Sequence, residues 1–546
     1  MSDSKFIRGT IIIALGTFIT KFLGMIYVFP FERLVGTQGG ALYTYGYVPY
    51  TIFLSIATMG VPLAVSKFVS KYNSLGEYST SRKMLRTGFS LMIVMGVISF
   101  LTLYSIAPII SPYIIGDDPH GNTVEDVTKV IRMVSFALLV VPAMSLIRGF
   151  FQGHQSMGPT TVSQIVEQIV RIAFLLIGSF IVIKGLDGTI PQAINVSTFA
   201  AFIGALGGSA ILAWYWVKRK HHFEELVASN PTKPILTTKE MMKEIMTYAA
   251  PFVFVGLAIP LYQQIDSFTF NRAMSDIGQG DVAESAFSIF TMWGHKLIMI
   301  PVSLATAFSL TLVPAITKYF VSGQMDVVKK QISQTIQITF FLTLPAVVGM
   351  SLLATPIYNT FYQLNELGGD ILKWYAPVAL LFSLYSVLVA ILQGLNLQRF
   401  AVFSLSIGVL IKMFTNVPLI HAFETYGAII STALGYTASI VYTYLVIRRS
   451  TNGAFVLLFR RIFQITIITT IMSFCVVFTL KLLSLWLDYT KSATDSFITV
   501  LICGTVGVVV YFLLSYKLNM FSKVLGKDIT KRFANRFKKR RRGSVS

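Results

Sequence analysis

Charged residues and cysteines are scarce in this sequence of 546 residues. Only 13% of the residues are charged, against about one quarter in a soluble globular domain, while 54% are hydrophobic. This balance excludes a water-soluble globule. The two cysteines, Cys475 and Cys503, both lie inside apolar runs, so the sequence offers no disulfide framework and no spacing typical of a zinc site.

Soluble domains and nucleotide-binding motifs are also missing. The longest stretch between apolar runs, 218–244, has under 30 residues, which is too short for a domain of its own. No GxxxxGK[ST] motif is present, and the basic residues behind the net charge of +21 are scattered instead of forming one patch with interleaved aromatic residues. The sequence therefore predicts no nucleic-acid partner, no cofactor and no enzymatic activity.

Long apolar stretches make up most of the chain. A membrane-spanning helix needs roughly 20 apolar residues, and about fourteen such stretches can be placed. We expect them near 8–30, 42–66, 88–110, 130–151, 161–183, 194–217, 246–268, 286–316, 332–354, 371–393, 401–420, 425–447, 462–486 and 496–517. The predicted fold class is an all-α polytopic membrane protein. The first stretch resembles a signal peptide, but no small-residue cleavage site follows it, so we expect it to be retained as a span.

Lysine and arginine concentrate in alternate connections. Basic clusters follow the second, sixth, eighth and twelfth spans, at 67–86, 218–220, 318–330 and 448–461, whereas the intervening connections are acidic or neutral. The positive-inside rule then places both termini in the cytoplasm, which requires an even number of spans. The predicted location is the cell membrane, crossed many times.

The C-terminal tail repeats apolar residues at a helical spacing among nine basic ones. Leu525, Ile529, Phe533 and Phe537 recur every four residues. This pattern predicts a basic amphipathic helix that lies on anionic lipid. Such a helix has two possible roles. It anchors the topology of the chain, or it recruits lipid or regulates the protein.

Two pairs of segments suggest an internal repeat. Phe151-Gln152-Gly153 resembles Leu392-Gln393-Gly394, and the segment that ends at Lys67 resembles the one that ends at Lys318, with offsets of about 240 to 250 residues. Six spans separate each pair, so the halves have the same orientation. We expect an N-lobe at 1–217, a cytoplasmic linker at 218–244, a C-lobe at 245–447, two further spans at 448–519 and a basic cytoplasmic tail at 520–546. Two parallel lobes around a cleft are typical of alternating-access transporters.

Charged residues inside the apolar stretches are the candidate site residues. Such a residue costs roughly 2.5 to 3.5 kcal/mol at the bilayer centre on insertion scales and usually faces a polar cavity. The candidates are Lys21, Lys296, Arg171, Arg148 and Lys67 for binding, and Asp266 and Glu167 as a coupling group or counter-charge. No metal site is expected.

Several of these candidates have a structural interpretation as well. Glu167 and Arg171 have the i, i+4 spacing of an ion pair within one helix. Arg148 also fits a positive flank of its span, and a further lysine, Lys412, fits snorkelling to an interface. Asp266 is either a counter-charge to a lysine or a cation or proton site. Lys21 and Lys296 lie too deep for easy snorkelling, so a cavity role is favoured for both.

Two lysines that converge in a cleft favour an anionic solute. An ammonium group is a strong point-charge partner for phosphate. A phosphate-bearing lipid fits best, because its head group can occupy the cleft while its tail stays in the bilayer.

Three segments carry a resemblance to a known family. They are Thr20-Lys21-Phe22-Leu23-Gly24, the stretch from Arg148-Gly-Phe-Phe-Gln-Gly through Met157-Gly-Pro159 to Gln168, and His295-Lys296 through Pro314. On these the chain resembles the MOP exporter superfamily, and within it the polysaccharide-biosynthesis or MurJ-type lipid II flippases of Gram-positive bacteria. The resemblance implies a monomer in the bacterial cell membrane that moves undecaprenyl diphosphate carrying a disaccharide-pentapeptide to the outer leaflet, in contact with cell-wall synthesis proteins.

The resemblance also implies positions for the basic cavity residues. Two of these positions fall on Lys21 and Lys296, whereas two others fall on Tyr27 and near Phe53. These departures suggest that Arg171 or Lys67 supplies charge instead. Alternative substrates are another undecaprenyl-linked polysaccharide or teichoic-acid unit, or, for an antiporter of the MATE type, a cation or drug. The sequence leaves the glycan, the coupling ion and the oligomeric state open.

Overall fold

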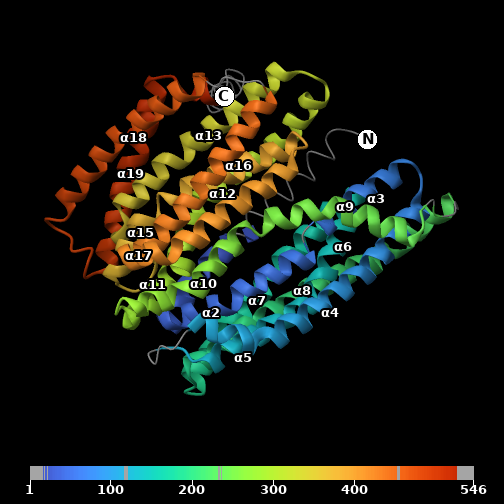
Figure 1. Ribbon diagram of the computed structural model, residues 1–546, viewed down its shortest axis with the longest axis horizontal. Coiled ribbons are helices and arrows are strands. Elements are labelled where there is room, and N and C mark those ends of the chain that lie inside the picture. Colours follow the sequence, from blue (N-terminus) through green and yellow to red (C-terminus); the bar gives the residue numbers. More distant parts are fainter. Residues whose placement is uncertain are drawn as a thin grey trace, which may run out of the picture. The chain divides into compact units, whose positions relative to one another are not determined.

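The computed structural model in Figure 1 describes residues 22–525 except 59, 116–120, 231–233, 235 and 452–455, together with Gly16, Ile19 and Thr20. The chain folds into two compact units, Met1–Trp293 and Gly294–Ser546. Every regular element in the described ranges is helical, which confirms the predicted all-α class. The division into lobes that the repeat predicts has a different boundary and stays a prediction.

Unit 1 contains ten α-helices in its described ranges. They are α2 (Val28–Thr58), α3 (Val61–Ser74), α4 (Tyr78–Ile115), α5 (Val124–Ser135), α6 (Val141–Gly153), α7 (Met157–Phe180), α8 (Ile190–Ser229), α9 (Thr238–Gly256), α10 (Ala258–Asp276) and α11 (Gly280–Ser288). A 3₁₀ turn joins α5 to α6 and a π-helical turn follows α7.

Unit 2 contains the remaining described helices. They are α12 (Gly294–Val321), α13 (Met325–Leu352), α14 (Ala354–Phe361), α15 (Glu366–Tyr375), α16 (Val378–Gly394), α17 (Gln398–Thr451), α18 (Val456–Leu483), α19 (Ala493–Lys517) and α20 (Met520–Leu525).

The membrane-spanning character of the chain is evident from length and hydropathy. Ten helical stretches among the described residues are long and apolar enough to cross a bilayer. Two of these, Phe22–Ser74 and Gln398–Thr451, have 53 and 54 residues and contain non-helical backbone, at Gly36 and at Phe423 and Glu424. Each is long enough for two crossings, and α9–α10 and α11–α12 are long enough for two more. The number of fourteen spans stays a prediction.

Close packing of α7 on α8 positions the polar groups of unit 1. A Cβ atom added at Gly204 would lie 2.7 Å from the Cβ of Arg171, and one at Gly208 would lie 3.1 Å from a guanidinium nitrogen of Arg148. Small residues allow helix backbones to approach in a membrane, where apolar burial drives association only weakly. The two helices run side by side in Figure 1, so the charged side chains of α7 lie directly against α8.

Matched turns support the predicted repeat. The α6–α7 turn has Gln155 at φ 56°, and the Ser156 amide donates to the Phe151 carbonyl at 2.9 Å. The α16–α17 turn repeats this geometry, with Asn396 at φ 59° and the Leu397 amide donating to Leu392 at 2.8 Å.

A second pair of turns shows the same correspondence. Gly76 after α3 and Gly323 after α12 adopt φ 76° and 73°, which glycine reaches without steric cost. The turn residues 155 and 396 are 241 positions apart and the glycines are 247 apart, in line with the offsets expected from the sequence.

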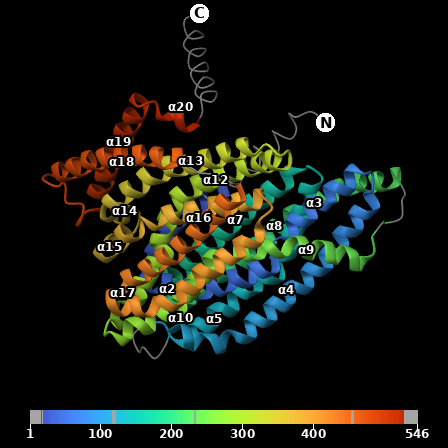
Figure 2. The same cartoon turned by 45° about the horizontal axis from the view of Figure 1, so that its top comes forward.

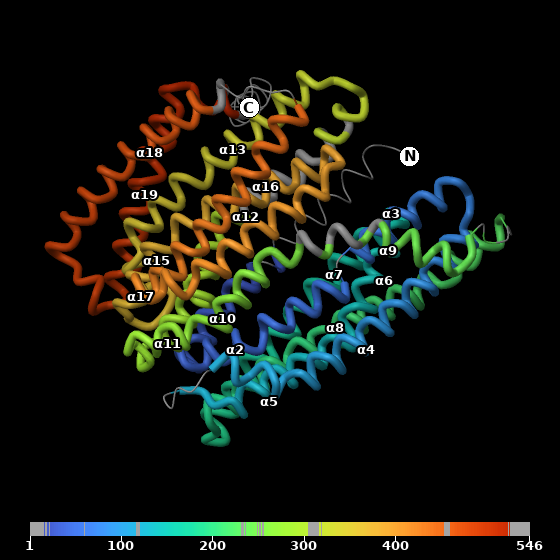
Figure 3. Tube along the Cα trace, viewed as in Figure 1, coloured from blue at the N-terminus to red at the C-terminus, as the bar shows by residue number. Residues whose placement is uncertain are grey.

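The last helices of unit 2 form a layer of their own, as Figures 2 and 3 show for α18 and α19 beside α13. The Tyr511 hydroxyl of α19 donates to the Phe341 carbonyl of α13 at 2.8 Å, and Arg461 of α18 donates to Gln337 of α13 at 2.7 Å. On α18 Phe463 and Phe478 are 66% exposed, as expected of side chains that face lipid.

Candidate functional site

An ion pair joins α6 to α7 inside unit 1. The Nη2 atom of Arg148 lies 2.7 Å from Oε2 of Glu167, and the two side chains are only 12% and 23% exposed. This interhelical pair takes the place of the Glu167–Arg171 pair expected within α7. The i, i+4 spacing is therefore a misleading signal here, because Arg171 turns to another helix.

Hydroxyl groups complete the surroundings of Arg148. Its Nε and Nη2 atoms donate to the Ser163 hydroxyl at 3.2 and 2.7 Å, and that hydroxyl donates to the Gly208 carbonyl of α8 at 2.9 Å. Thr160 donates to the backbone carbonyl of Arg148 at 3.2 Å. The network ties three helices together and neutralises the guanidinium charge with a carboxylate.

Arg171 meets a group of tyrosines on α2 instead. Its Nη2 atom donates to the hydroxyl groups of Tyr43, at 3.1 Å, and Tyr47, and its Cζ atom lies 5.1 Å from the centre of the Tyr47 ring. The Tyr43 and Tyr47 rings stack with their centres 5.1 Å apart, as their i, i+4 spacing on α2 allows. Among the described residues, the hydrogen bonds of this guanidinium go to phenol oxygens and not to a carboxylate.

Tyr27 belongs to the same neighbourhood. It interacts electrostatically with both Arg171 and Tyr43. Tyr27 is one of the positions where the family resemblance implies a basic residue. Arg171 lies near this position, and its role as a substitute for the implied basic residue stays a prediction.

The Arg171 cluster has the chemistry of an anion-binding site. A guanidinium presents five N–H donors in a planar fork that matches phosphate oxygens, and among the described residues this one bonds neutral phenols and no carboxylate. The tyrosine hydroxyls align the fork and add polar groups beside it. Sequence reasoning missed Tyr43 and Tyr47, although their spacing of four residues in an apolar helix is a visible signal.

The predicted lysine pair stays a prediction. Lys21 lies outside the described residues, and Lys296 is half-buried at the start of α12 in unit 2. Its neighbour His295 packs among aromatic residues, with Nδ1 at 2.8 Å from the Tyr375 hydroxyl and its ring centre 5.9 Å from that of Phe382.

The other candidates are placed in unit 1 at separate points. Lys67 is exposed on α3, with its ammonium 5.7 Å from the centre of the Phe68 ring. Asp266 is buried on α10. Glu32 is buried on α2 as well, and sequence reasoning missed it because the first span was expected to end at residue 30.

Lys412 in unit 2 corrects an expectation. Snorkelling to an interface was favoured, but the side chain is completely buried between the two halves of α17. Its Nζ atom donates to the Thr432 hydroxyl at 2.8 Å and to Asn416 Oδ1 at 3.2 Å, and lies 3.5 Å from the Ala428 carbonyl. The break at Phe423 and Glu424 brings these oxygens to the lysine, and sequence alone gives no sign of that fold-back.

Comparison with solved structures shows which known folds this chain resembles. The chain is similar to a structure titled "Lipid II flippase MurJ, inward closed conformation", with a TM-score of 0.65 at 15% identity over 94% of this chain and 99% of that one. It is also similar to an inward-facing MATE family transporter of the MOP superfamily, with a TM-score of 0.64 at 13% identity over 78% and 94% of the chains. The fold of this chain is therefore the all-helical, polytopic fold that these two structures share.

Sequence comparison identifies the family. The chain belongs to the family described as polysaccharide biosynthesis protein, which matches residues 6–320. It is 50% identical over 532 residues to the lipid II flippase MurJ of Bacillus subtilis (strain 168), covering 96% of this chain and 98% of that one. It is 23% identical to the stage V sporulation protein B of the same organism, over 76% and 77% of the chains. The resemblance that the sequence motifs indicated is confirmed.

Proposed function

We propose that this protein is a lipid II flippase, which moves undecaprenyl-diphosphate-linked muropeptide from the inner to the outer leaflet of the bacterial cell membrane by alternating access. The 50% identity to a relative with that name, over nearly the whole of both chains, is the observation that carries the proposal. The protein acts as a transporter and not as a catalyst. Both termini lie in the cytoplasm, in accord with the positive-inside distribution of its loops.

The diphosphate of the substrate is the group that the basic side chains recognise. Arg171 supports this assignment, because its charge is left uncompensated by the tyrosine hydroxyls that hold it. Lys21, Lys296 and Lys67 add positive charge along the path of the head group. Asp266 serves as counter-charge or coupling group between transport steps.

The Arg148–Glu167 pair has a different role in this proposal. Its charges neutralise each other at 2.7 Å, so it braces α6 against α7 and keeps Arg171 in position on α7. The net positive charge of the site then comes from Arg171 and the lysines.

The membrane potential favours the proposed direction. An interior-negative potential of 100 mV assists outward movement of an anion by about 2.3 kcal/mol per charge. A doubly charged diphosphate therefore gains enough to bias transport, without a nucleotide or a catalytic step.

Depletion of the protein in its host tests the proposal. The lipid-linked intermediate that accumulates on the cytoplasmic face is identified by extraction and mass spectrometry, with inward and outward pools separated by an impermeant labelling reagent. The proposal expects lipid II to build up inside and to return to the outer leaflet when the intact gene is restored. Accumulation of a different undecaprenyl-linked glycan, with lipid II still reaching the outer leaflet, would assign the chain to another polymer.

A further inference from the structure

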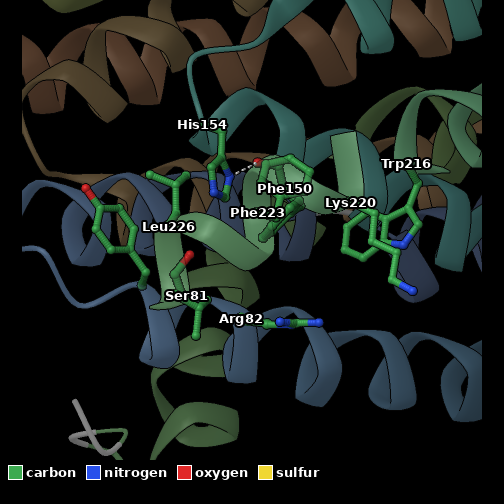
Figure 4. Close-up of a pocket in the computed structure, with 10 residues that line it drawn as sticks. Ser81, Arg82, Phe150, His154, Trp216, Lys220, Phe223 and Leu226 are labelled. Carbon is green, nitrogen blue, oxygen red and sulfur yellow. Dashed lines mark hydrogen bonds between the residues drawn. The ribbon is translucent and has the colours of Figure 1, made fainter. Parts of the chain in front are cut away.

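A pocket lined by aromatic and basic side chains lies in unit 1 at the end that carries basic loops. Its enclosed part has room for about one water molecule and the rest is open to solvent, between the start of α4, the end of α6 and the end of α8. Figure 4 shows its labelled side chains, which combine aromatic, basic and hydroxyl groups. The pocket includes none of the residues assigned above to transport.

The walls of the pocket are aromatic and its rim is basic. Phe150, Trp216 and Phe223 line it, and the Phe150 and Phe223 ring centres are 5.4 Å apart. Arg82 and Lys220 line it too, and both approach one carboxylate, that of Glu224, at 3.7 and 3.9 Å. Two cations at such distances from one shared and exposed carboxylate leave positive charge at the rim.

Ser81 adds a buried polar group to the pocket. It lines the pocket, is 1% exposed, and its hydroxyl has no hydrogen-bond partner among the described residues. A buried hydroxyl without a partner is costly, so such a group signals a missing acceptor or donor.

His154 offers a further nitrogen to the same pocket. Its Nδ1 atom lies 3.1 Å from the Phe150 carbonyl, an acceptor, so this nitrogen carries the proton and Nε2 is left for other contacts. Burial, together with the nearby His222, lowers the pKa of His154. The imidazole is therefore neutral at physiological pH, and the charge of the pocket comes from its arginine and lysine.

Arg82 and Lys220 each lie at one end of a row of exposed apolar residues. On α4 the exposed residues Phe89, Ile93 and Val97 follow Arg82 at helical spacing along one face. On α8 the exposed Trp214 and Val217 precede Lys220 in the same way. An occupant with a phosphate at the rim can therefore lay acyl chains along these rows.

We propose that this pocket binds the head group of an anionic phospholipid of the leaflet that meets the basic loops. Arg82 and Lys220 hold the phosphate, and the Ser81 hydroxyl donates to a head-group oxygen. The aromatic walls contact the glycerol region. Basic pockets between transmembrane helices on the cytoplasmic side recognise lipid head groups by this combination of charge and depth. Free phosphate satisfies the cations but leaves the apolar rows unused, so a lipid is the favoured occupant.

Quenching of Trp216 by brominated lipid tests the proposal. The intact protein is placed in phosphatidylcholine nanodiscs that contain rising fractions of phosphatidylglycerol with brominated acyl chains. The part of the quenching that is lost in Trp216→Phe comes from Trp216, and it therefore measures lipid bound at the pocket. We expect saturation at a low fraction of phosphatidylglycerol, and no such saturation with brominated phosphatidylcholine.

Variants separate the pocket from general surface charge. The double variant Arg82→Gln/Lys220→Gln should raise the half-saturating lipid fraction about tenfold or more. Ser81→Leu should do the same by filling the pocket, while Lys330→Gln, which removes an exposed basic charge in unit 2, should leave it unchanged. A thermal melt in pure phosphatidylcholine checks that each variant is folded.

Three results would overturn the proposal. They are equal quenching of Trp216 by both brominated lipids, an unchanged phosphatidylglycerol curve in the folded double variant, and displacement of the lipid by inorganic phosphate. The last result would make free phosphate the ligand of the same cations.

Discussion

Arg148 and Arg171 lie in the same unit and both reach partners across helices, yet their surroundings differ in one respect. Arg148 meets a carboxylate at 2.7 Å, whereas Arg171 meets tyrosine hydroxyls. A guanidinium that is already neutralised braces helices, while one held by neutral oxygens keeps its charge for a ligand. The sequence alone does not distinguish these two roles. Arg148 lies near the end of one apolar stretch and Arg171 lies inside the next, so both are candidates for the same site.

The largest expected effect comes from removing the uncompensated charge. Arg171→Met should lower lipid II externalisation about tenfold or more, because a hydrogen bond to a charged group contributes roughly 1.5 to 3 kcal/mol. Arg171→Lys should restore part of the activity, since it keeps the charge but loses the planar fork. Labelling of outward-facing lipid II in depleted cells measures both. Wild-type activity in Arg171→Met would remove the distinction between the two arginines.

Lys412 extends the comparison to a cation that is completely buried. Lys412→Met should lower stability by about 1 to 3 kcal/mol, because the Thr432 hydroxyl and the Asn416 amide lose a charged partner. Thermal unfolding in detergent should show a lower midpoint for Lys412→Met than for Arg171→Met. An unchanged midpoint would mean that the network around Lys412 contributes nothing to the α17 fold-back.

A double-mutant cycle tests the bracing role of the ion pair. Arg148→Met alone should destabilise the protein by about 1 to 3 kcal/mol, because Glu167 is left without its partner in a poorly solvated position. Adding Glu167→Gln should recover most of that loss. Additive effects in thermal unfolding would show that the two side chains do not stabilise one another.

The tyrosine hydroxyls should have a smaller influence than the guanidinium they hold. Tyr43→Phe and Tyr47→Phe each remove one hydrogen bond, worth about 1 kcal/mol, and leave the rings and the Arg171 charge in place. Externalisation should fall severalfold in the double variant and less in either single one. A loss as complete as that of Arg171→Met would assign the phenols a direct part in binding.

The smallest expected effect is a pH dependence of the protein's stability, caused by His154 in the pocket of Figure 4. Burial lowers its pKa, so as the pH falls below about 6.5 the unfolded chain takes up a proton before the folded protein does. Stability should therefore decline from that pH down to the lowered pKa, and be unaffected above it. Thermal midpoints between pH 5 and 8 measure this slope, which His154→Phe should reduce. An equal slope in that variant would assign the dependence to other groups.

The class and family of this protein follow from its sequence, but the partners of its charges do not. Apolar length and loop charge predict a polytopic helical protein because both depend on local composition alone. The partner of Glu167 depends on how α6 and α7 pack, and the oxygens around Lys412 depend on a break at Phe423 and Glu424. Such contacts arise from tertiary packing, which spacing along one helix cannot report.

Tyrosines and glycines in the apolar stretches also indicate contacts of the candidate site. Tyr43 and Tyr47 have the spacing of stacked neighbours on one helix face, and a polar face within an apolar span indicates a polar partner. The small residues Gly204 and Gly208 likewise indicate the close approach of α8 to α7. A selection of site residues by charge alone therefore leaves out the tyrosines and glycines that surround the two arginines.

The central claim is that Arg171 keeps its charge for the substrate, whereas the Arg148–Glu167 pair is a brace between helices. Transport of fluorescent lipid II in proteoliposomes, followed by loss of fluorescence to an impermeant quencher, compares Arg171→Met with the charge-balanced double variant Arg148→Met/Glu167→Gln. The account predicts that Arg171→Met lowers transport about tenfold or more, while the folded double variant keeps it. Transport at the wild-type rate in Arg171→Met, or its loss in the folded double variant alone, would contradict the account.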